Sequence, residues 1–411
     1  MTKNKIIKDF ILSIIASLLP IVVLQFVIFP SISLKIAPNK YGEFLTMIGL
    51  VTLISGSMGT VLNNIRLINI KKYKELKGDF SSILLIFLTL NGLLVAVAIF
   101  YYREISSGFD ILLLVFSSFL IIITGYSIVA FRIELNYKNI LYSSVYLSCG
   151  YIVGYFVFLI TNYWGWIYFI GNLFYLGIII RKSTILKEPF KKTRYYKATL
   201  KDSMLLLFST LLLSGTLYID RLLIYPLLGG LAVSVYYTAT LLPKTLALIL
   251  QPLSSVLLSY LAHLKDFKLI KYIKYLVVLC VSIILSYYII VWISEPILTI
   301  LYPQFVKESI LYVKMAAIIG ILSIVTNLLN PIVLKFYHLK WQLILNSIFI
   351  TVYSITSISL GMRHGVIGFF YGGLIANSIK LILLVLIVLL SGKNIDQGGK
   401  NNGKNNKEII R

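Results

Sequence analysis

Residues 181–202 read RKSTILKEPFKKTRYYKATLKD, which is the longest hydrophilic segment between apolar runs in this chain of 411 residues. On both sides of it lie apolar runs of about 20 residues, the length of helix that crosses a bilayer core of ~30 Å. Six runs precede the segment and six follow it. We predict membrane spans at 10–34, 43–65, 80–102, 110–131, 140–160, 164–180, 203–228, 231–262, 275–294, 309–333, 341–360 and 366–391.

The composition agrees with a membrane protein. Hydrophobic residues make up 59% of the chain and charged residues only 13%, whereas a soluble domain is about 25% charged. This shortfall of charge excludes a soluble enzyme, a disordered regulator and a secreted disulfide scaffold. The sequence therefore predicts an all-α, polytopic integral membrane protein with about 12 transmembrane helices.

The distribution of basic residues predicts the orientation. With the N-terminus inside, 29 of the 38 Lys and Arg residues fall in cytoplasmic segments and 5 in outer loops, and the other four lie within spans. This asymmetry is the positive-inside signal of a membrane protein. We therefore expect both termini and the 181–202 linker to be cytoplasmic. The net charge of +23 is therefore explained by the basic cytoplasmic segments, and we expect no nucleic-acid partner.

The linker divides the chain into an N-terminal bundle at 1–180 and a C-terminal bundle at 203–391, each with six predicted spans. An even number of spans gives both halves the same topology, as in a parallel pseudo-twofold repeat. A weak internal echo agrees, because similar residues follow the first and seventh spans at the same spacing. These are Ala37-Pro38, Gly42 and Phe44, and Gly229-Gly230, Ser234 and Tyr236. The Gly-, Asn- and Lys-rich tail at 392–411 is predicted to be disordered.

Polar residues recur at helical spacing inside several spans. Residues three and four apart share a helix face, and a polar face in a membrane helix either packs against another helix or lines a wet cavity. Both readings stay open for any one helix. The candidate cavity-lining residues are Tyr237, Thr240, Gln251, Asn327, Asn330 and Asn377.

Charged residues within the spans favour a cavity for an anion. At 1.5 Å per residue, Lys244 and Lys380 lie about 20 Å and about 21 Å from the predicted outer ends of their helices. Asp220 is the one carboxylate that lies inside a span rather than at its first residue, against four cations within the spans. The candidate substrate-binding cations are Lys244, Lys380, Arg66 at the inner end of the second span, and Arg221. Asp220 is the candidate for coupling transport to an ion.

Catalytic and metal-binding patterns are missing from the sequence. It has no phosphate-cradling glycine loop and no carboxylate cluster. Cys149 and Cys280 both lie inside apolar runs, and the three histidines are far apart. We therefore expect a protein that is not an enzyme and has no cofactor and no metal site.

Two stretches resemble a known family. PNKYGEFLTMIGLVTLISGSMGTVLNN (38–64) and YIDRLLIYPLLGGLAVSVYYTATLLPKTLALILQPL (218–253) are similar to bacterial polysaccharide flippases of the O-antigen (Wzx) type, within the multidrug/oligosaccharidyl-lipid/polysaccharide exporter superfamily. The second stretch carries Asp220, Leu228-Gly229 and Tyr236 at the family's positions. Ser234 departs from the glycine that the resemblance leads us to expect.

The resemblance implies movement of an undecaprenyl-diphosphate-linked oligosaccharide from the cytoplasmic to the outer leaflet of the bacterial inner membrane, for O-antigen, lipopolysaccharide or capsule assembly. It further implies that the cavity cations face the glycan or its diphosphate. The expected partners are this lipid-linked glycan, the bilayer, and a polysaccharide polymerase with its chain-length regulator. Two alternatives stay open, a multidrug antiporter of the same superfamily and a membrane glycan polymerase. The short outer loops argue against the polymerase.

Overall fold

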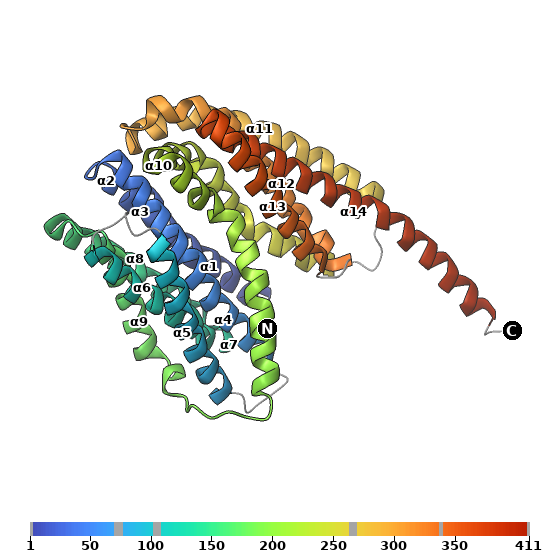
Figure 1. Cartoon of the computed structure of the whole chain (residues 1–411). Helices are drawn as coiled ribbons and strands as arrows, with labels where there is room; N and C mark the ends of the chain where they lie inside the picture. Colours follow the sequence, from blue (N-terminus) through green and yellow to red (C-terminus); the bar gives the residue numbers. More distant parts are fainter. Residues whose placement is uncertain (1–2, 70–76, 102–107, 263–268, 337–339, 409–411) are drawn as a thin grey trace. The chain divides into compact units, whose positions relative to one another are not determined.

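In the part of the chain that it describes, the computed structural model contains helices and the loops that join them, and no strand (Figure 1). It describes the backbone of residues 3–69, 77–101, 108–262, 269–336 and 340–408, and the side chains of residues 8–69, 77–98, 108–250, 285–330 and 341–387.

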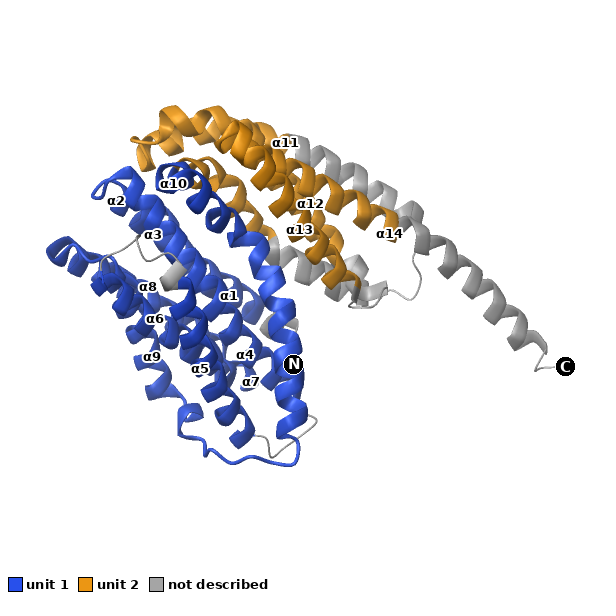
Figure 2. Ribbon diagram, viewed as in Figure 1, with its two compact units in different colours: residues 1–234 blue, residues 235–411 orange. Residues whose placement is uncertain are grey.

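The chain forms two compact units, Met1–Ser234 and Val235–Arg411 (Figure 2). Unit 1 contains α1 (Lys3–Val22), η1 (Val23–Ile28), α2 (Phe29–Ser33), α3 (Pro38–Val51), η2 (Thr52–Gly56), α4 (Ser57–Asn69), α5 (Lys77–Tyr101), α6 (Gly108–Ser127), α7 (Val129–Ile133), α8 (Tyr137–Thr161), α9 (Gly165–Lys182), η3 (Ile185–Lys187) and the first part of α10 (Tyr196–Ala262). Unit 2 contains the rest of α10, α11 (Leu269–Leu301), α12 (Val306–Phe336), α13 (Lys340–His364) and α14 (Val366–Glu408). The boundary between units thus lies within α10, and the division into six-helix halves at the linker stays a prediction.

Nine helices in the described residues are long and apolar enough to cross a membrane. One of them, Tyr196–Leu250 within α10, covers the seventh predicted span and most of the eighth, because the two helices join without a loop at Gly229, where φ is +79° and ψ is 179°. The sixth predicted span corresponds to α9, and the ninth falls on α11, whose side chains are described only from residue 285. The all-helical, multi-span fold is confirmed, and a layout of 12 helices in two bundles is consistent with it.

The first and second predicted spans each contain a stretch of π-helix, in which a turn holds more residues than a turn of α-helix. In the first span η1 follows Pro20, which cannot donate a backbone hydrogen bond within the helix. In the second span η2 separates α3 from α4. Such π-helical turns inside α-helices are frequent at functional sites.

The two echoing segments found in the sequence lie against each other within unit 1. A Cβ atom at Gly42 would lie 1.8 Å from the carbonyl oxygen of Gly230, so only glycine allows this approach. The Asn39 carboxamide accepts a hydrogen bond from the Leu231 amide (3.1 Å), and the Ser234 hydroxyl donates to the Pro38 carbonyl (2.8 Å). Ser234, the departure from the expected glycine, thus adds a hydrogen bond at this junction.

The last helix, α14, continues to Glu408, and the disorder of residues 392–411 stays a prediction.

Candidate functional site

The two deep lysines both belong to unit 2 and are carried by helices that pack against α12. Pro243, next to Lys244 on α10, lies against Gly320 of α12, where an added Cβ would be 2.4 Å away. On α14, Gly373 lies against Ile319 of the same helix. The helices that carry Lys244 and Lys380 therefore contact α12 at adjacent residues.

Each lysine ammonium group lies over an aromatic ring. The Nζ atom of Lys380 is 5.1 Å from the centre of the Phe349 ring on α13, and that of Lys244 is 5.6 Å from the Tyr236 ring on its own helix. Lys380 is buried, with 6% of its surface exposed, and Lys244 is half-buried. A ring face attracts a cation by about 0.5–2 kcal/mol.

An aromatic row extends from the Lys244 contact. The rings of Tyr236 and Phe370 have centres 4.6 Å apart, and Phe370 stacks on Tyr312 at 5.1 Å with only 10° between the ring planes. The row joins α10, α14 and α12, so three helices of unit 2 meet beside Lys244.

The predicted polar lining residues are buried or half-buried wherever their side chains are described. Thr240 and Asn377 are buried and donate to carbonyl groups of their own helices, at 2.9 Å to Tyr236 and 2.8 Å to Gly373. Tyr237 is buried with its ring edge-on to Tyr302. Asn327 and Asn330 are half-buried, and the side chain of Gln251 lies outside the described residues. The cavity-lining roles of these residues stay predictions.

Asp220 and Arg221 lie in unit 1 and are both buried. The Asp220 carboxylate accepts a hydrogen bond from the backbone amide of Arg221 (2.8 Å). The Arg221 guanidinium lies 5.7 Å from the ring of Tyr218, and its side chain packs beside Gly49 of α3.

Arg66 is held by a partner that the sequence analysis missed. Its guanidinium makes two hydrogen bonds of 2.6 Å to the two carboxylate oxygens of Glu188, and it donates a further hydrogen bond to the Tyr126 hydroxyl. Glu188 lies 122 residues away in the linker. The one available signal was a lone glutamate in the middle of a strongly basic segment.

The segment that carries Glu188 is docked on unit 1. We call residues 183–195 the strap. Asp79, in the first turn of α5, accepts hydrogen bonds from the Thr193 amide (2.6 Å) and hydroxyl (2.5 Å), and Gly78 leaves space for the backbone of Lys191. Ile185 joins the hydrophobic core of unit 1. The linker predicted between the bundles therefore packs against unit 1 along much of its length.

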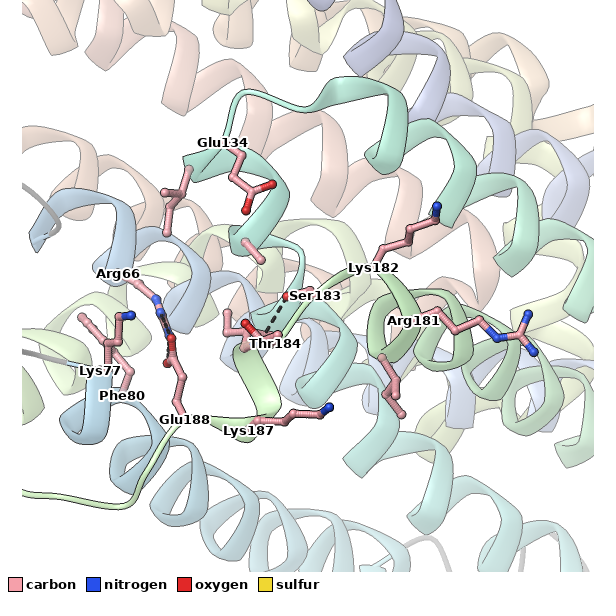
Figure 3. Close-up of a pocket in the computed structure, with 14 residues that line it drawn as sticks. Arg66, Lys77, Phe80, Glu134, Arg181, Lys182, Ser183, Thr184, Lys187 and Glu188 are labelled. Carbon is pink, nitrogen blue, oxygen red and sulfur yellow. Dashed lines mark hydrogen bonds and ion pairs between the residues drawn. The ribbon is translucent and has the colours of Figure 1, made fainter.

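A pocket of about 580 Å³ lies in unit 1 beside the strap (Figure 3). It is lined by Arg66, Lys77, Phe80, Ala130, Ile133, Glu134, Ile180, Arg181, Lys182, Ser183, Thr184, Ile185, Lys187 and Glu188. Of the sequence-predicted site residues, this pocket contains only Arg66.

A second missed feature is a buried polar chain across three helical segments of unit 1. The Ser55 hydroxyl donates to the Asn91 carboxamide oxygen (2.8 Å), and the Asn91 amide donates to Ser118 (2.8 Å). All three side chains are fully buried. These bonds tie η2, α5 and α6 together, which favours a packing role for Ser55.

Among the described residues, no group of three or more His, Cys, Asp and Glu side chains is placed to hold a metal ion.

Comparisons with known proteins identify the fold. The chain matches no protein-family profile and no curated protein sequence. Among solved structures it resembles the lipid II flippase MurJ in an inward closed conformation, with a TM-score of 0.68 and 17% identity over 94% of this chain and 86% of that chain. The likeness shows that the two chains share a fold. An inward-facing multidrug resistance MATE family transporter of the MOP superfamily matches with a TM-score of 0.66 and 13% identity, over 93% of this chain and 99% of that one. An outward-facing multidrug resistance MATE family transporter matches with a TM-score of 0.61 and 12% identity, over 94% of this chain and 96% of that one.

Proposed function

We propose that this chain is a flippase that moves an undecaprenyl-diphosphate-linked oligosaccharide from the inner to the outer leaflet of the bacterial inner membrane, for O-antigen or capsule assembly. The observation that carries the proposal is the pair of lysines in unit 2, each over an aromatic ring within a bundle of membrane-spanning helices. The fold shared with transporters, one of them a lipid II flippase, supports it.

The energetics of the lysines favour an anionic substrate. A lysine at the centre of a membrane helix costs about 2.5–3.5 kcal/mol on the insertion scale, and a cation–π contact returns about 0.5–2 kcal/mol. An anionic group beside either ammonium group would offset the remaining cost. The diphosphate of a lipid-linked glycan supplies about two negative charges, one for each lysine.

A multidrug antiporter of the same superfamily is the second candidate. It is supported by the length of the match, because the chain covers 99% of the inward-facing multidrug transporter and 86% of the flippase. The charges of unit 2 oppose it. Residues 235–391 contain three carboxylates, Asp266, Glu295 and Glu308, and all three lie outside the predicted spans. A site for organic cations would need a carboxylate within the bundle.

Asp220 is the candidate for ion coupling in this scheme. Each charge that crosses 100 mV is worth about 2.3 kcal/mol, so a potential that is negative inside already favours export of an anion. If Asp220 couples a proton, Asp220→Asn weakens transport more under a proton gradient alone than under a potential alone. Equal loss under both conditions, measured in reconstituted vesicles, would leave Asp220 with a structural role.

The proposal includes an orientation with both termini and the strap in the cytoplasm. It also includes the polysaccharide polymerase and chain-length regulator as partners that receive the exported glycan lipid.

A deletion strain distinguishes the two candidate functions. The flippase proposal predicts that a lipid-linked glycan accumulates on the cytoplasmic side and that surface glycan is lost, while susceptibility to cationic drugs is unchanged. Increased drug susceptibility with normal surface glycan would contradict the proposal and support the antiporter.

A further inference from the structure

The pocket at the strap end of unit 1 has the charge of an anion site. Five of its lining residues are cations and two are carboxylates, Glu134 and Glu188. The five cations are Arg66, Lys77, Arg181, Lys182 and Lys187. Its volume of about 580 Å³ falls within the range of small-molecule sites, about 300–1,000 Å³. The pocket is thus large enough for a phosphate-bearing head group.

Arg66 provides the specific feature of this pocket. It is 93% buried, with 7% of its surface exposed, and its guanidinium lies 5.3 and 5.7 Å from the centres of the Phe80 and Tyr126 rings. These contacts and the hydrogen bond to the Tyr126 hydroxyl hold the guanidinium in place. A fixed guanidinium binds carboxylate and phosphate in the same bidentate geometry.

Glu188 occupies that bidentate position from the strap. Figure 3 shows Arg66 and Glu188 pointing toward each other, with the paired contacts of 2.6 Å between them. The carboxylate is the same kind of group as an anionic ligand, and it is supplied by a segment that has only short helical structure of its own, η3. The chain thus places its own anion where an anionic ligand would bind.

The other cations of the pocket remain available. Lys77, Arg181, Lys182 and Lys187 are exposed, and none of these four forms an ion pair with a residue that the structure describes. The Ser183 and Thr184 side chains add hydroxyl groups to the wall. The pocket therefore keeps an excess of positive charge after Arg66 and Glu188 neutralise each other.

The strap also carries exposed apolar side chains beside this pocket. Phe190 is 65% exposed and Leu186 is 37% exposed, and both alternate with lysines in the sequence LKEPFKK, 186–192. Apolar side chains among lysines at the end of a membrane bundle are typical of a segment that contacts the lipid surface.

We propose that this pocket binds the phosphate group of a membrane amphiphile and that Glu188 holds the Arg66 position until the phosphate replaces it. Two sources share this chemistry, the head group of an anionic phospholipid and the diphosphate of a lipid-linked substrate. The site lies in unit 1, and the proposal does not depend on the transport role of Lys244 and Lys380.

Binding to the full-length protein in phosphatidylcholine nanodiscs tests the proposal. The probes are farnesyl diphosphate and inorganic diphosphate, measured by calorimetry, and phosphatidylglycerol, measured by native mass spectrometry. We expect Glu188→Gln to strengthen binding of the preferred probe at least threefold, because the competing carboxylate is lost. The Lys182→Gln/Lys187→Gln double variant should weaken it about tenfold, which is about 1.4 kcal/mol.

The double variant changes exposed side chains, so it leaves the buried packing around Arg66 intact. Its matched control is Lys192→Gln/Lys197→Gln, which removes the same charge from residues that do not line the pocket. Weaker binding of the preferred probe by the pocket variant but not by the control supports the proposal, and equally weakened binding by both variants overturns it. An unchanged affinity in Glu188→Gln overturns the competition by Glu188.

The preferred probe identifies the source of the phosphate. Preference for phosphatidylglycerol assigns the site to a resident phospholipid, and preference for farnesyl diphosphate assigns it to the diphosphate of a lipid-linked substrate. Binding of inorganic diphosphate as tightly as farnesyl diphosphate, with no phosphatidylglycerol bound, overturns the membrane source. These readouts measure binding alone, so they stay distinct from a failure of the flippase proposal, which is measured by transport.

Discussion

Lys380 and Lys244 are the residues on which the proposed substrate class depends. Alanine at either position should reduce surface glycan about tenfold while leaving protein abundance near the wild-type level, because the charge acts on the substrate. Arginine should restore more activity than glutamine. Surface-glycan staining, normalised to protein in the membrane, measures the effect.

The matched control for these variants is Lys314→Ala, because Lys314 is an exposed lysine on α12 of the same unit. We expect this variant to export normally. Normal export by the Lys244 and Lys380 alanine variants as well would remove both lysines from the site.

Gly42 tests the close approach between the two echoing segments. Alanine there would place its Cβ atom 1.8 Å from the Gly230 carbonyl oxygen, and neither backbone can yield without moving a helix. Overpacking of this kind costs about 1–3 kcal/mol, so Gly42→Ala should lower the melting temperature of the purified protein and its abundance in the membrane. Gly177→Ala on α9 is the control, since nothing lies within 4 Å of that position. If the two variants melt alike, the helices are not in contact at Gly42.

At the scale of elements, the sequence predicted the helices better than their partners. Apolar runs and the positive-inside pattern depend on the solvent on each side of a helix, so they can be read locally. The break at Gly229 fell where the sequence placed a very short join between two spans. The partners of Arg66 and Asp79 could not be read in this way, because Glu188 and Thr193 are more than 100 residues away and in the linker.

The predicted site shows the same limit. Periodicity placed Thr240 and Asn377 on polar faces, but it could not tell that their side chains bond to their own helices. It also missed Asn91, because a single asparagine in an apolar helix has no periodicity. The hydrogen bonds of Asn91 with Ser55 and Ser118 form only where η2, α5 and α6 meet.

The strap should be released when Asp79 loses its charge and one of its two acceptor oxygens. Asp79→Asn replaces the acceptor of two short hydrogen bonds from Thr193, and hydrogen bonds to a charged group are worth about 1.5–3 kcal/mol each. We expect trypsin to cut the strap near Lys191 at least several times faster in this variant. Asp202→Asn, which changes an exposed carboxylate at the start of α10, is the control. Equal cleavage rates in Asp79→Asn and the wild type would show that the strap is not held at Asp79.

At the scale of the whole molecule, the charge asymmetry predicts which residues face the cytoplasm. A cysteine replacing Lys192 should be protected from an impermeant thiol reagent in intact cells, and one replacing Gln304 should be labelled. Both positions are exposed in the structure, so accessibility reports the side of the membrane. Labelling of the cysteine at position 192 from outside would reverse the orientation and the estimated depths of both lysines.

The proposed flippase activity is tested most directly in vesicles that contain the purified protein, a fluorescent undecaprenyl-diphosphate-linked oligosaccharide and an imposed membrane potential. The fraction of labelled lipid that becomes accessible to an added glycosidase measures translocation, and efflux of ethidium is measured in parallel. We predict translocation well above that of empty vesicles, its loss in the Lys244→Ala/Lys380→Ala variant, and no ethidium transport. Ethidium efflux without movement of the glycan lipid would contradict the flippase and identify a drug transporter.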